Sequence, residues 1–218
     1  MAAPPDLRAV AFDFDGVILD SAHMKTKAFE QLFAPEGPKA SGRILAYHKA
    51  NAGISRFVKF RWAYREVLDR PLSEEEERAL GERFNRLVED AVVAADWIPG
   101  AREFLEKHSG SIPLYVASGT PETELRRIIE RRALDAYFRA AYGSPASKKD
   151  ILLRVARELG CAPGAIVMVG DARNDLAGAE GAGTRFVGVV PSGSEDPFPP
   201  EARVIPDLTR LEEALRRP

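Results

Sequence analysis

The sequence is poor in the residues on which several classes of protein depend. Its 218 residues include one cysteine, Cys161, and three histidines. A single cysteine cannot form an internal disulfide bond, which excludes a disulfide-stapled scaffold and fits a reducing compartment. So few cysteines and histidines also form no cluster of the kind that holds zinc in proteins.

Long apolar runs and a strong net charge are missing as well. No run approaches the ~18 apolar residues that cross a bilayer, and residues 1–6 lack the basic and apolar regions of a signal peptide. The formal net charge is only -2, which gives no indication of binding to nucleic acid or to an anionic membrane. We therefore expect a cytoplasmic protein that binds neither nucleic acid nor membrane. No pattern specifies an oligomeric state.

What remains is the composition of an ordinary globular protein. Hydrophobic residues make up 45% of the chain and charged residues 29%, which is typical of a soluble domain with a packed core. The length suits one domain, or one domain that carries an insertion.

The most informative stretch runs from Val10 to Ser21. It begins as an apolar strand and ends in Asp13-Phe14-Asp15-Gly16. Two carboxylates so close together repel each other, and their burial is costly unless a cation or a proton neutralises them. We therefore expect the carboxyl end of a buried strand to bring both aspartates to a metal-dependent site. Gly16 would allow a sharp turn and expose backbone N–H groups to an anion.

Residues 21–96 predict only helices. The expected helices start after Ser21, cover 43–50 and 57–68, and start again at Ser73, where Ser73 and Glu76 match a capping box. Pro35, Gly37 and Pro38 are expected to break the first of them. We interpret residues 21–96 as a helical cap domain inserted into a core that consists of residues 1–20 and 97–218.

Strands and helices alternate after the insertion, which predicts an α/β fold. This pattern indicates a Rossmann-like parallel sheet with helices on both faces. Pro121 is expected at the first helical position after a Thr120 cap. The expected strands are 8–14, 112–117, 138–142, 165–169, 184–190 and 204–205, and the expected helices are 101–108, 121–132, 148–159, 173–180 and 207–216.

Polar residues follow several of these strands, at the edge of the sheet where ligands bind. Ser118 and Gly119 precede a helix N-terminus, which suits an anion. Lys148 or Lys149 lies at a helix start, and Asp171 and Asp175 follow another strand. Three acidic positions around a hard cation, with a lysine and a hydroxyl facing an anion, describe a phosphoryl-transfer site. Oxygen ligands favour Mg²⁺ over zinc.

At this point the sequence resembles the haloacid dehalogenase superfamily. The four motifs of that superfamily are matched in order, and the helical insertion resembles its type 1 cap. The presence of the second aspartate, Asp15, favours members that act on phosphate esters. The matching segments are Asp13-Phe14-Asp15-Gly16-Val17, Ser118-Gly119-Thr120, Lys148 and Gly170-Asp171-Ala172-Arg173-Asn174-Asp175.

The resemblance implies a role for each of these residues in hydrolysis of a small phosphorylated metabolite. Asp13 would be the nucleophile that forms an aspartyl-phosphate, and Asp15 the general acid and base. Mg²⁺ would bind the Asp13 carboxylate, the Asp15 backbone carbonyl and Asp171, with Asp175 holding a metal-bound water or the lysine. The groups implied to bind the phosphate are Gly16, Ser118, the Gly119 N–H and Lys148, which is favoured over Lys149 because it follows the capping Ser147.

Two alternatives stay open. The loop Ala52-Gly53-Ile54-Ser55-Arg56 is similar to a loop in the cap of β-phosphoglucomutases, so a sugar phosphomutase is the second hypothesis. However, Ala52 replaces a lysine of that loop, and Lys25 stands where those enzymes have a histidine. The third hypothesis is a non-catalytic metabolite-binding or regulatory protein. In the cap, Arg56 is expected to bind the unreactive end of the substrate, and Lys25 to be a substrate or surface cation. His23, His48 and His108 are expected at helix surfaces.

Overall fold

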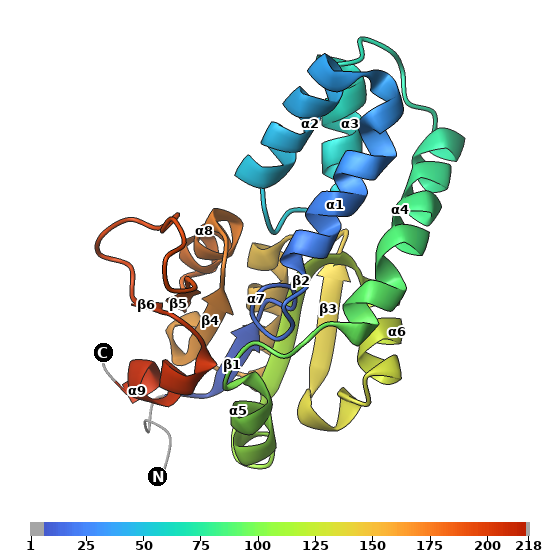
Figure 1. Ribbon diagram of the computed structural model, residues 1–218. Helices are drawn as coiled ribbons and strands as arrows, with labels where there is room; N and C mark the ends of the chain where they lie inside the picture. Colours follow the sequence, from blue (N-terminus) through green and yellow to red (C-terminus); the bar gives the residue numbers. More distant parts are fainter. Residues whose placement is uncertain (1–6, 217–218) are drawn as a thin grey trace.

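A parallel sheet forms the centre of the molecule (Figure 1). The computed structural model describes residues 7–216. In this part of the chain six strands lie in the order β3-β2-β1-β4-β5-β6, and every neighbouring pair is parallel. The strands are β1 (Ala9–Phe12), β2 (Leu114–Pro121), β3 (Ala140–Ser144), β4 (Ile166–Gly170), β5 (Arg185–Val189) and β6 (Val204–Ile205).

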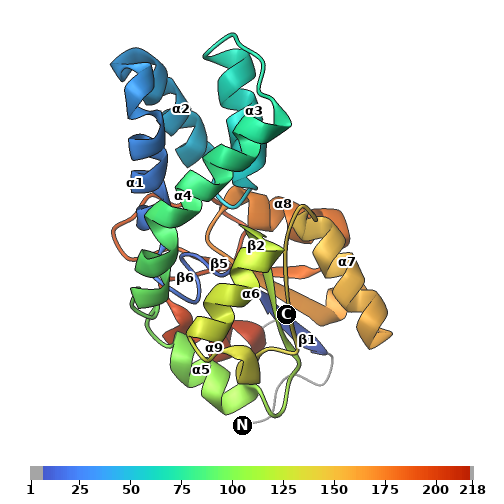
Figure 2. The same ribbon diagram turned by 90° about the vertical axis from the view of Figure 1, so that its right-hand side faces the viewer.

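The two faces of β1 show why helices cover both sides of this sheet. Successive side chains of a strand point to opposite faces, and all four residues of β1 are fully buried. Val10 and Phe12 share a cluster with α5, α6 and α9, whereas Ala9 and Ala11 face α7 and α8 (Figure 2). This arrangement confirms the predicted α/β fold. The helices are α5 (Ala101–His108), α6 (Glu122–Arg131), α7 (Lys148–Leu159), α8 (Arg173–Ala182) and α9 (Leu211–Arg216).

Four helices between β1 and β2 form a second lobe at the carboxyl end of the sheet (Figure 1). Their core contains packed aromatic rings, with Phe29 in contact with Phe33, Phe60 and Phe84 at centroid distances of 5.2–6.0 Å. This lobe is the inserted helical cap, and its assignment to residues 21–96 stays our proposal. The helices are α1 (Ala22–Phe33), α2 (Pro38–Ala50), α3 (Arg56–Glu66) and α4 (Glu74–Ala94).

The chain enters and leaves this lobe through two segments that lie side by side. The Asp20 N–H donates to the Asp96 carbonyl at 2.9 Å, and the Ile98 N–H donates to the Ile18 carbonyl at 3.0 Å. A bridge between Leu19 and Trp97 lies between these bonds. The cap is therefore joined to the core by two paired segments.

Several element boundaries differ from the sequence-based expectation. Pro38 begins α2 instead of ending the preceding helix, because a proline is well suited to the first helical turn. Strand β2 continues through Pro121, so Ser118 lies inside the strand and Pro121 precedes α6. The predicted capping box of Ser73 and Glu76 is present at the start of α4.

Short 3-10 segments complete the described chain. They cover Ala34–Glu36, Asp135–Tyr137, Pro163–Ala165 and Leu208–Arg210. Within residues 7–216, no helix combines the length and the apolar character needed to span a bilayer.

Candidate functional site

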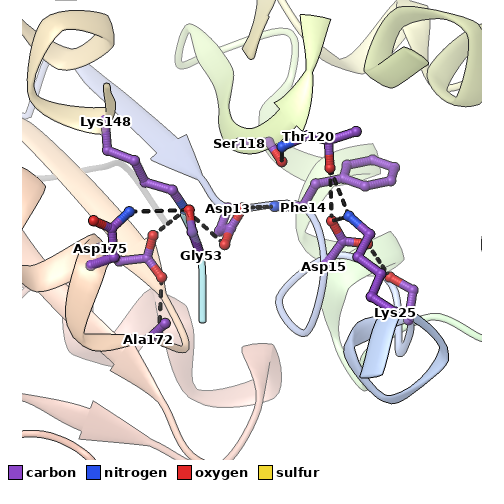
Figure 3. A network of polar contacts seen from close by, with 12 residues as sticks. Asp13, Phe14, Asp15, Lys25, Gly53, Ser118, Thr120, Lys148, Ala172 and Asp175 are labelled. Carbon is purple, nitrogen blue, oxygen red and sulfur yellow. Dashed lines mark hydrogen bonds and ion pairs between the residues drawn. The ribbon is translucent and has the colours of Figure 1, made fainter. Parts of the chain in front are cut away.

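Asp13 lies just after β1, and its carboxylate is almost completely buried, with the residue 3% exposed. Its Oδ1 accepts the Phe14 N–H at 2.7 Å, and its Oδ2 pairs with the Lys148 Nζ at 2.7 Å. The strand thus brings Asp13 to the edge of the sheet that faces the cap (Figure 3).

Lys148 joins two carboxylates from different elements. It is the first residue of α7, and its buried ammonium group pairs with Asp13 and also with Asp175 of α8 (Figure 3). The second oxygen of Asp175 accepts the Ala172 N–H at 3.0 Å. Lys149 is exposed, so the structure brings Lys148, and not Lys149, to Asp13.

The charges on this side of the site do not balance. Carboxylate oxygens of Asp13, Asp171 and Asp175 lie within 4.8 Å of one another, and Lys148 supplies one positive charge, which leaves two negative charges. Burial, together with repulsion from Asp175 and Asp15, raises the pKa of Asp13 to about 7 against the opposing effect of Lys148. Burial and then Asp13 raise the pKa of Asp171 well above its usual value.

These residues fit a divalent cation. In residues 7–216 no side chain or N–H group forms a hydrogen bond or ion pair with the Asp171 carboxylate. Oxygen ligands suit Mg²⁺, and two positive charges would balance the excess. The Asp171 carboxylate is the one of the three without a hydrogen-bond or ion-pair partner in residues 7–216, whereas both oxygens of Asp13 and both oxygens of Asp175 already have one.

The Asp15 carboxylate points to the other side of the site (Figure 3). It accepts hydrogen bonds from Ser21 at 2.6 Å and Thr120 at 3.2 Å and pairs with Lys25 of the cap. Burial alone would raise the pKa of Asp15, but Lys25 and the two hydroxyl groups together lower it below its usual value. The sequence did not predict the contact of Thr120, whose side chain was expected to cap a helix.

Gly16 forms the sharp turn that was expected, but its N–H group is already engaged. Its N–H donates to the Leu19 carbonyl at 2.7 Å, so this amide is not free to bind a phosphate. The φ angle is +82°, and a Cβ added at Gly16 would lie 2.2 Å from Oδ2 of Asp171. Glycine is therefore required here for the turn and for the close approach of Asp171.

Ser118 and Gly119 lie on β2 opposite these aspartates. The buried Ser118 hydroxyl oxygen accepts the Thr120 N–H at 3.1 Å. A Cβ added at Gly119 would lie 2.4 Å from the carbonyl oxygen of Gly53 in the cap. The same carbonyl accepts a hydrogen bond from the Asn174 side chain at 3.0 Å, so the cap loop rests directly on two segments of the core.

A cavity of ≈ 250 Å³ lies between the two lobes. Pockets for drug-sized molecules have volumes of roughly 300–1,000 Å³, so this one suits a small metabolite. Its core side includes the predicted site residues Asp13, Asp15, Ser118, Gly119 and Asp171. Its cap side includes Lys25, His48, Lys49, Arg56 and Lys59.

Arg56 does not present a free guanidinium group to this cavity. The group pairs with both carboxylate oxygens of Glu124 on α6 and lies 5.0 Å from the ring centre of Phe84. Arg56 is 7% exposed. Glu124 therefore engages Nη1 and Nη2, whereas the buried Nε of Arg56 has no hydrogen-bond partner. That Arg56 binds the unreactive end of the substrate stays a prediction.

Only one of the histidines fits the expected surface position. His23 is exposed, whereas His108 is buried beside Glu212 of α9. His48 is buried in the cap and faces the cavity. Burial, and then repulsion from the nearby lysines Lys59, Lys25 and Lys49, lowers the pKa of His48 to about 3. Helical spacing alone did not separate the buried His48 from the exposed His23.

Comparisons with known proteins agree with this geometry. A sequence model described as haloacid dehalogenase-like hydrolase matches residues 7–183. The chain is 29% identical over 205 residues to a phosphoglycolate phosphatase of Escherichia coli, covering 84% of this chain and 81% of that protein.

Solved structures show the same fold. β-Phosphoglucomutase from Clostridium difficile superposes with a TM-score of 0.75 at 21% identity, over 94% of this chain and 93% of that chain. CbbY from Rhodobacter sphaeroides, in complex with phosphate, gives a TM-score of 0.69 at 21% identity, over 94% and 96% of the two chains.

Proposed function

Because the chain belongs to the haloacid dehalogenase-like hydrolases, we propose that it is a Mg²⁺-dependent phosphatase that hydrolyses a small phosphorylated metabolite. The observation that carries the proposal is the buried group of Asp13, Asp171, Asp175 and Lys148 with its two excess negative charges. Two of these residues, Asp13 and Asp171, line a cavity large enough for a small ester.

The first step is attack by a carboxylate oxygen of Asp13 on phosphorus. An aspartyl-phosphate bond forms while the bond from phosphorus to the alcohol oxygen breaks, and Asp15 gives a proton to that oxygen. Asp13 is held for attack because the Phe14 N–H and Lys148 fix its two oxygens. Lys148 also lowers the repulsion between the carboxylate and the incoming phosphate.

The second step is attack by water on the phosphorus of the aspartyl-phosphate. Asp15 takes a proton from the water, the bond between Asp13 and phosphorus breaks, and inorganic phosphate forms. The contacts of Asp15 with Lys25 and Thr120 keep its carboxylate ionised and oriented, which suits this base step. For the acid step, the contact with Lys25 has to loosen when the substrate binds.

The remaining polar groups bind the phosphate and the metal. Ser118 and the Gly119 N–H are proposed to bind phosphate oxygens from the β2 side of the cavity. Mg²⁺ would be held by Asp13, Asp171 and the Asp15 carbonyl, and Asp175 would position Lys148. When bound, the metal supplies positive charge that stabilises the phosphoryl group during transfer.

The test is turnover of p-nitrophenyl phosphate and of a panel of phosphorylated metabolites. The panel includes 2-phosphoglycolate, because curated relatives carry the name phosphoglycolate phosphatase. Release of inorganic phosphate should require Mg²⁺, stop on addition of EDTA and return when Mg²⁺ is restored. An isomerised sugar phosphate without phosphate release would instead establish the phosphomutase hypothesis, and no turnover on any compound would favour a non-catalytic protein.

The matched variant is Asp13→Asn. An amide nitrogen cannot replace the attacking carboxylate, so turnover should fall at least about 1,000-fold, as it does when a covalent nucleophile is removed. The melting temperature should not fall, since the change removes one of the repelling buried charges. Activity within tenfold of the unmodified protein would exclude Asp13 as the nucleophile.

A further inference from the structure

Lys59 on α3 is a buried cation with no acidic partner. The residue is 4% exposed, and lysines are almost never buried to this extent unless they are paired. Its ammonium group contacts the Nδ1 atom of His48 at 3.3 Å and the His48 carbonyl oxygen at 3.4 Å. Across residues 7–216, no carboxylate forms an ion pair with it.

His48 cannot neutralise this charge. Burial and the neighbouring lysines keep the pKa of His48 near 3, so the ring is neutral at physiological pH. Its Nε2 lies 3.3 Å from the Thr26 hydroxyl, and the tautomer with a proton on Nε2 leaves Nδ1 to accept from Lys59. The two His48 acceptors therefore orient the ammonium group and occupy two of its three donors, without supplying negative charge.

Arg56, one turn earlier on the same helix, shows the contrast. It is buried to a similar extent, yet Glu124 binds it through both carboxylate oxygens. An unpaired buried charge is costly, and burial followed by repulsion from Lys25 lowers the pKa of Lys59 to about 7. Lys59 is thus a buried cation without an acidic partner, which costs stability, whereas the buried cation of Arg56 has such a partner.

The position of Lys59 indicates which group could pair with its buried ammonium group. Lys59 lines the same ≈ 250 Å³ cavity as Asp13 and Ser118, together with Lys25 and Lys49 from neighbouring cap helices. The Lys25 ammonium group is already paired with Asp15, whereas Lys59 has no carboxylate partner in residues 7–216. A phosphate held at Asp13 would occupy the core side of the cavity. The rest of such a substrate would extend toward the cap side, where these cations gather.

We infer that Lys59, oriented by His48, forms a subsite for a second anionic group of the substrate, either a carboxylate or a second phosphate. The inference rests on the proposed phosphatase activity and narrows the substrate to a phosphate ester with a second negative charge a few atoms away. In this inference Lys59 binds the unreactive end of the substrate, a role that the sequence analysis expected for Arg56.

The test uses three phosphate esters with a two-carbon backbone. In the two charged esters, 2-phosphoglycolate and ethylene glycol bisphosphate, the second group is an anion, and in the uncharged ester, 2-hydroxyethyl phosphate, the second group is a neutral hydroxyl. The Mg²⁺-loaded protein should turn over at least one charged ester with a kcat/KM at least about tenfold above that of the uncharged one, the low end of the effect of a charge-assisted hydrogen bond. Which charged ester is preferred distinguishes a carboxylate from a phosphate subsite.

The variants are Lys59→Met, Lys59→Gln and Lys59→Arg, with Lys27→Met as the control because Lys27 is an exposed lysine of α1. Lys59→Met and Lys59→Gln should each reduce the preference for the charged ester at least tenfold, chiefly through a higher KM. Lys59→Arg should restore part of it, and Lys27→Met should leave it unchanged. A preference retained in Lys59→Met, or absent from the unmodified protein, would overturn the inference.

A binding measurement separates this inference from the proposed function. Calorimetry with Asp13→Asn gives a Kd for 2-phosphoglycolate, ethylene glycol bisphosphate and 2-hydroxyethyl phosphate without turnover. If the unmodified protein hydrolyses neither these esters nor any compound of the phosphatase panel, the phosphatase proposal fails, while a Kd that favours a charged ester and depends on Lys59 still supports the subsite. Equal Kd values for all three esters would refute it.

Discussion

At the scale of single residues, the site depends on a lysine enclosed by carboxylates. Lys148 is buried between Asp13 and Asp175, and the two carboxylates raise its pKa above the usual value although burial opposes them. Removal of the lysine would leave both carboxylates buried without their cation. Lys148 is therefore expected to stabilise the fold in addition to its proposed role in catalysis.

Lys148→Met should lower the free energy of unfolding by about 3–5 kcal/mol, the range for loss of one partner of a buried ion pair. The matched control is Lys149→Met, because Lys149 is exposed on the same turn of α7, and its effect should stay within about 0.5 kcal/mol. Urea denaturation without Mg²⁺ measures both values, and a phosphatase assay should rank the two variants in the same order. Equal losses would contradict the assignment of Lys148.

The sequence predicts those site residues that are positioned by local secondary structure, but not those that are positioned by contacts between distant segments. Asp13, Asp171 and Lys148 follow a strand or begin a helix, so the local pattern already placed them at one edge of the sheet. Lys25 and Thr120 are 95 positions apart, and their hydrogen bond depends on where the cap lies. The lack of an acidic partner for Lys59 could not be predicted either, since a sequence does not reveal which lysines have no carboxylate nearby.

At the scale of secondary-structure elements, the contact between α3 and α6 connects the cap to the core. Arg56 and Glu124 form a bidentate pair whose side chains are 7% and 15% exposed. The phenylalanine rings of the cap surround the guanidinium group, with Phe57 and Phe84 at 5.3 and 5.0 Å. Other residues of α6 also bind the cap, since Arg127 and Arg131 pair with Glu89 of α4, and the buried Arg56–Glu124 pair is one of several contacts that hold the cap against the core.

Arg56→Ala should therefore destabilise the protein by about 3–5 kcal/mol, because it leaves Glu124 partly buried without a partner. It should lower turnover of charged and uncharged esters alike, since the effect acts through cap position. Arg126→Ala is the control, because Arg126 forms an exposed pair with Glu122 on the same helix α6, and such pairs contribute at most about 1 kcal/mol. A loss confined to charged esters would instead make Arg56 a direct ligand.

The helix and strand pattern was predictable where local signals decide it. The capping box at Ser73 and Glu76 fixed the start of α4 in sequence and structure alike. Proline was ambiguous, because the residue that ends one helix can also start the next, as Pro38 does. Strand β2 runs on through Pro121 because its last residues pair with β3, a contact between distant segments.

At the scale of the whole molecule, the buried Lys59 should make stability depend on pH. Its pKa is about 7 in the folded protein against 10.5 for an exposed lysine. Between these values the unfolded chain binds more protons than the folded one, so a rise in pH favours folding. Below pH 7 both states keep the proton, and this contribution no longer changes with pH.

The free energy of unfolding should therefore rise more between pH 7 and pH 10 in the unmodified protein than in Lys59→Met. Groups that face Lys59 from neighbouring elements are Lys25 of α1 and His48 and Lys49 of α2, and Arg56 lies on its own helix. The ring of His48 is already neutral across this range. Urea titrations at several pH values give the comparison, with Lys27→Met as the control, and parallel curves for Lys59→Met and the unmodified protein would refute the expectation.

The close approach of the Gly53 carbonyl to Gly119 has a consequence for the rate of turnover. The cap loop lies against the strand that carries Ser118, and Ala52, Gly53 and Ile54 of this loop line the cavity. We expect this loop to separate from the core when a substrate enters or a product leaves, by movement of the cap about its paired connecting segments. Movements of this kind take microseconds to milliseconds. Movement of the cap would then limit the rate of turnover. A viscous solvent that slows this movement should lower the turnover rate, although the chemical steps at phosphorus are unaffected.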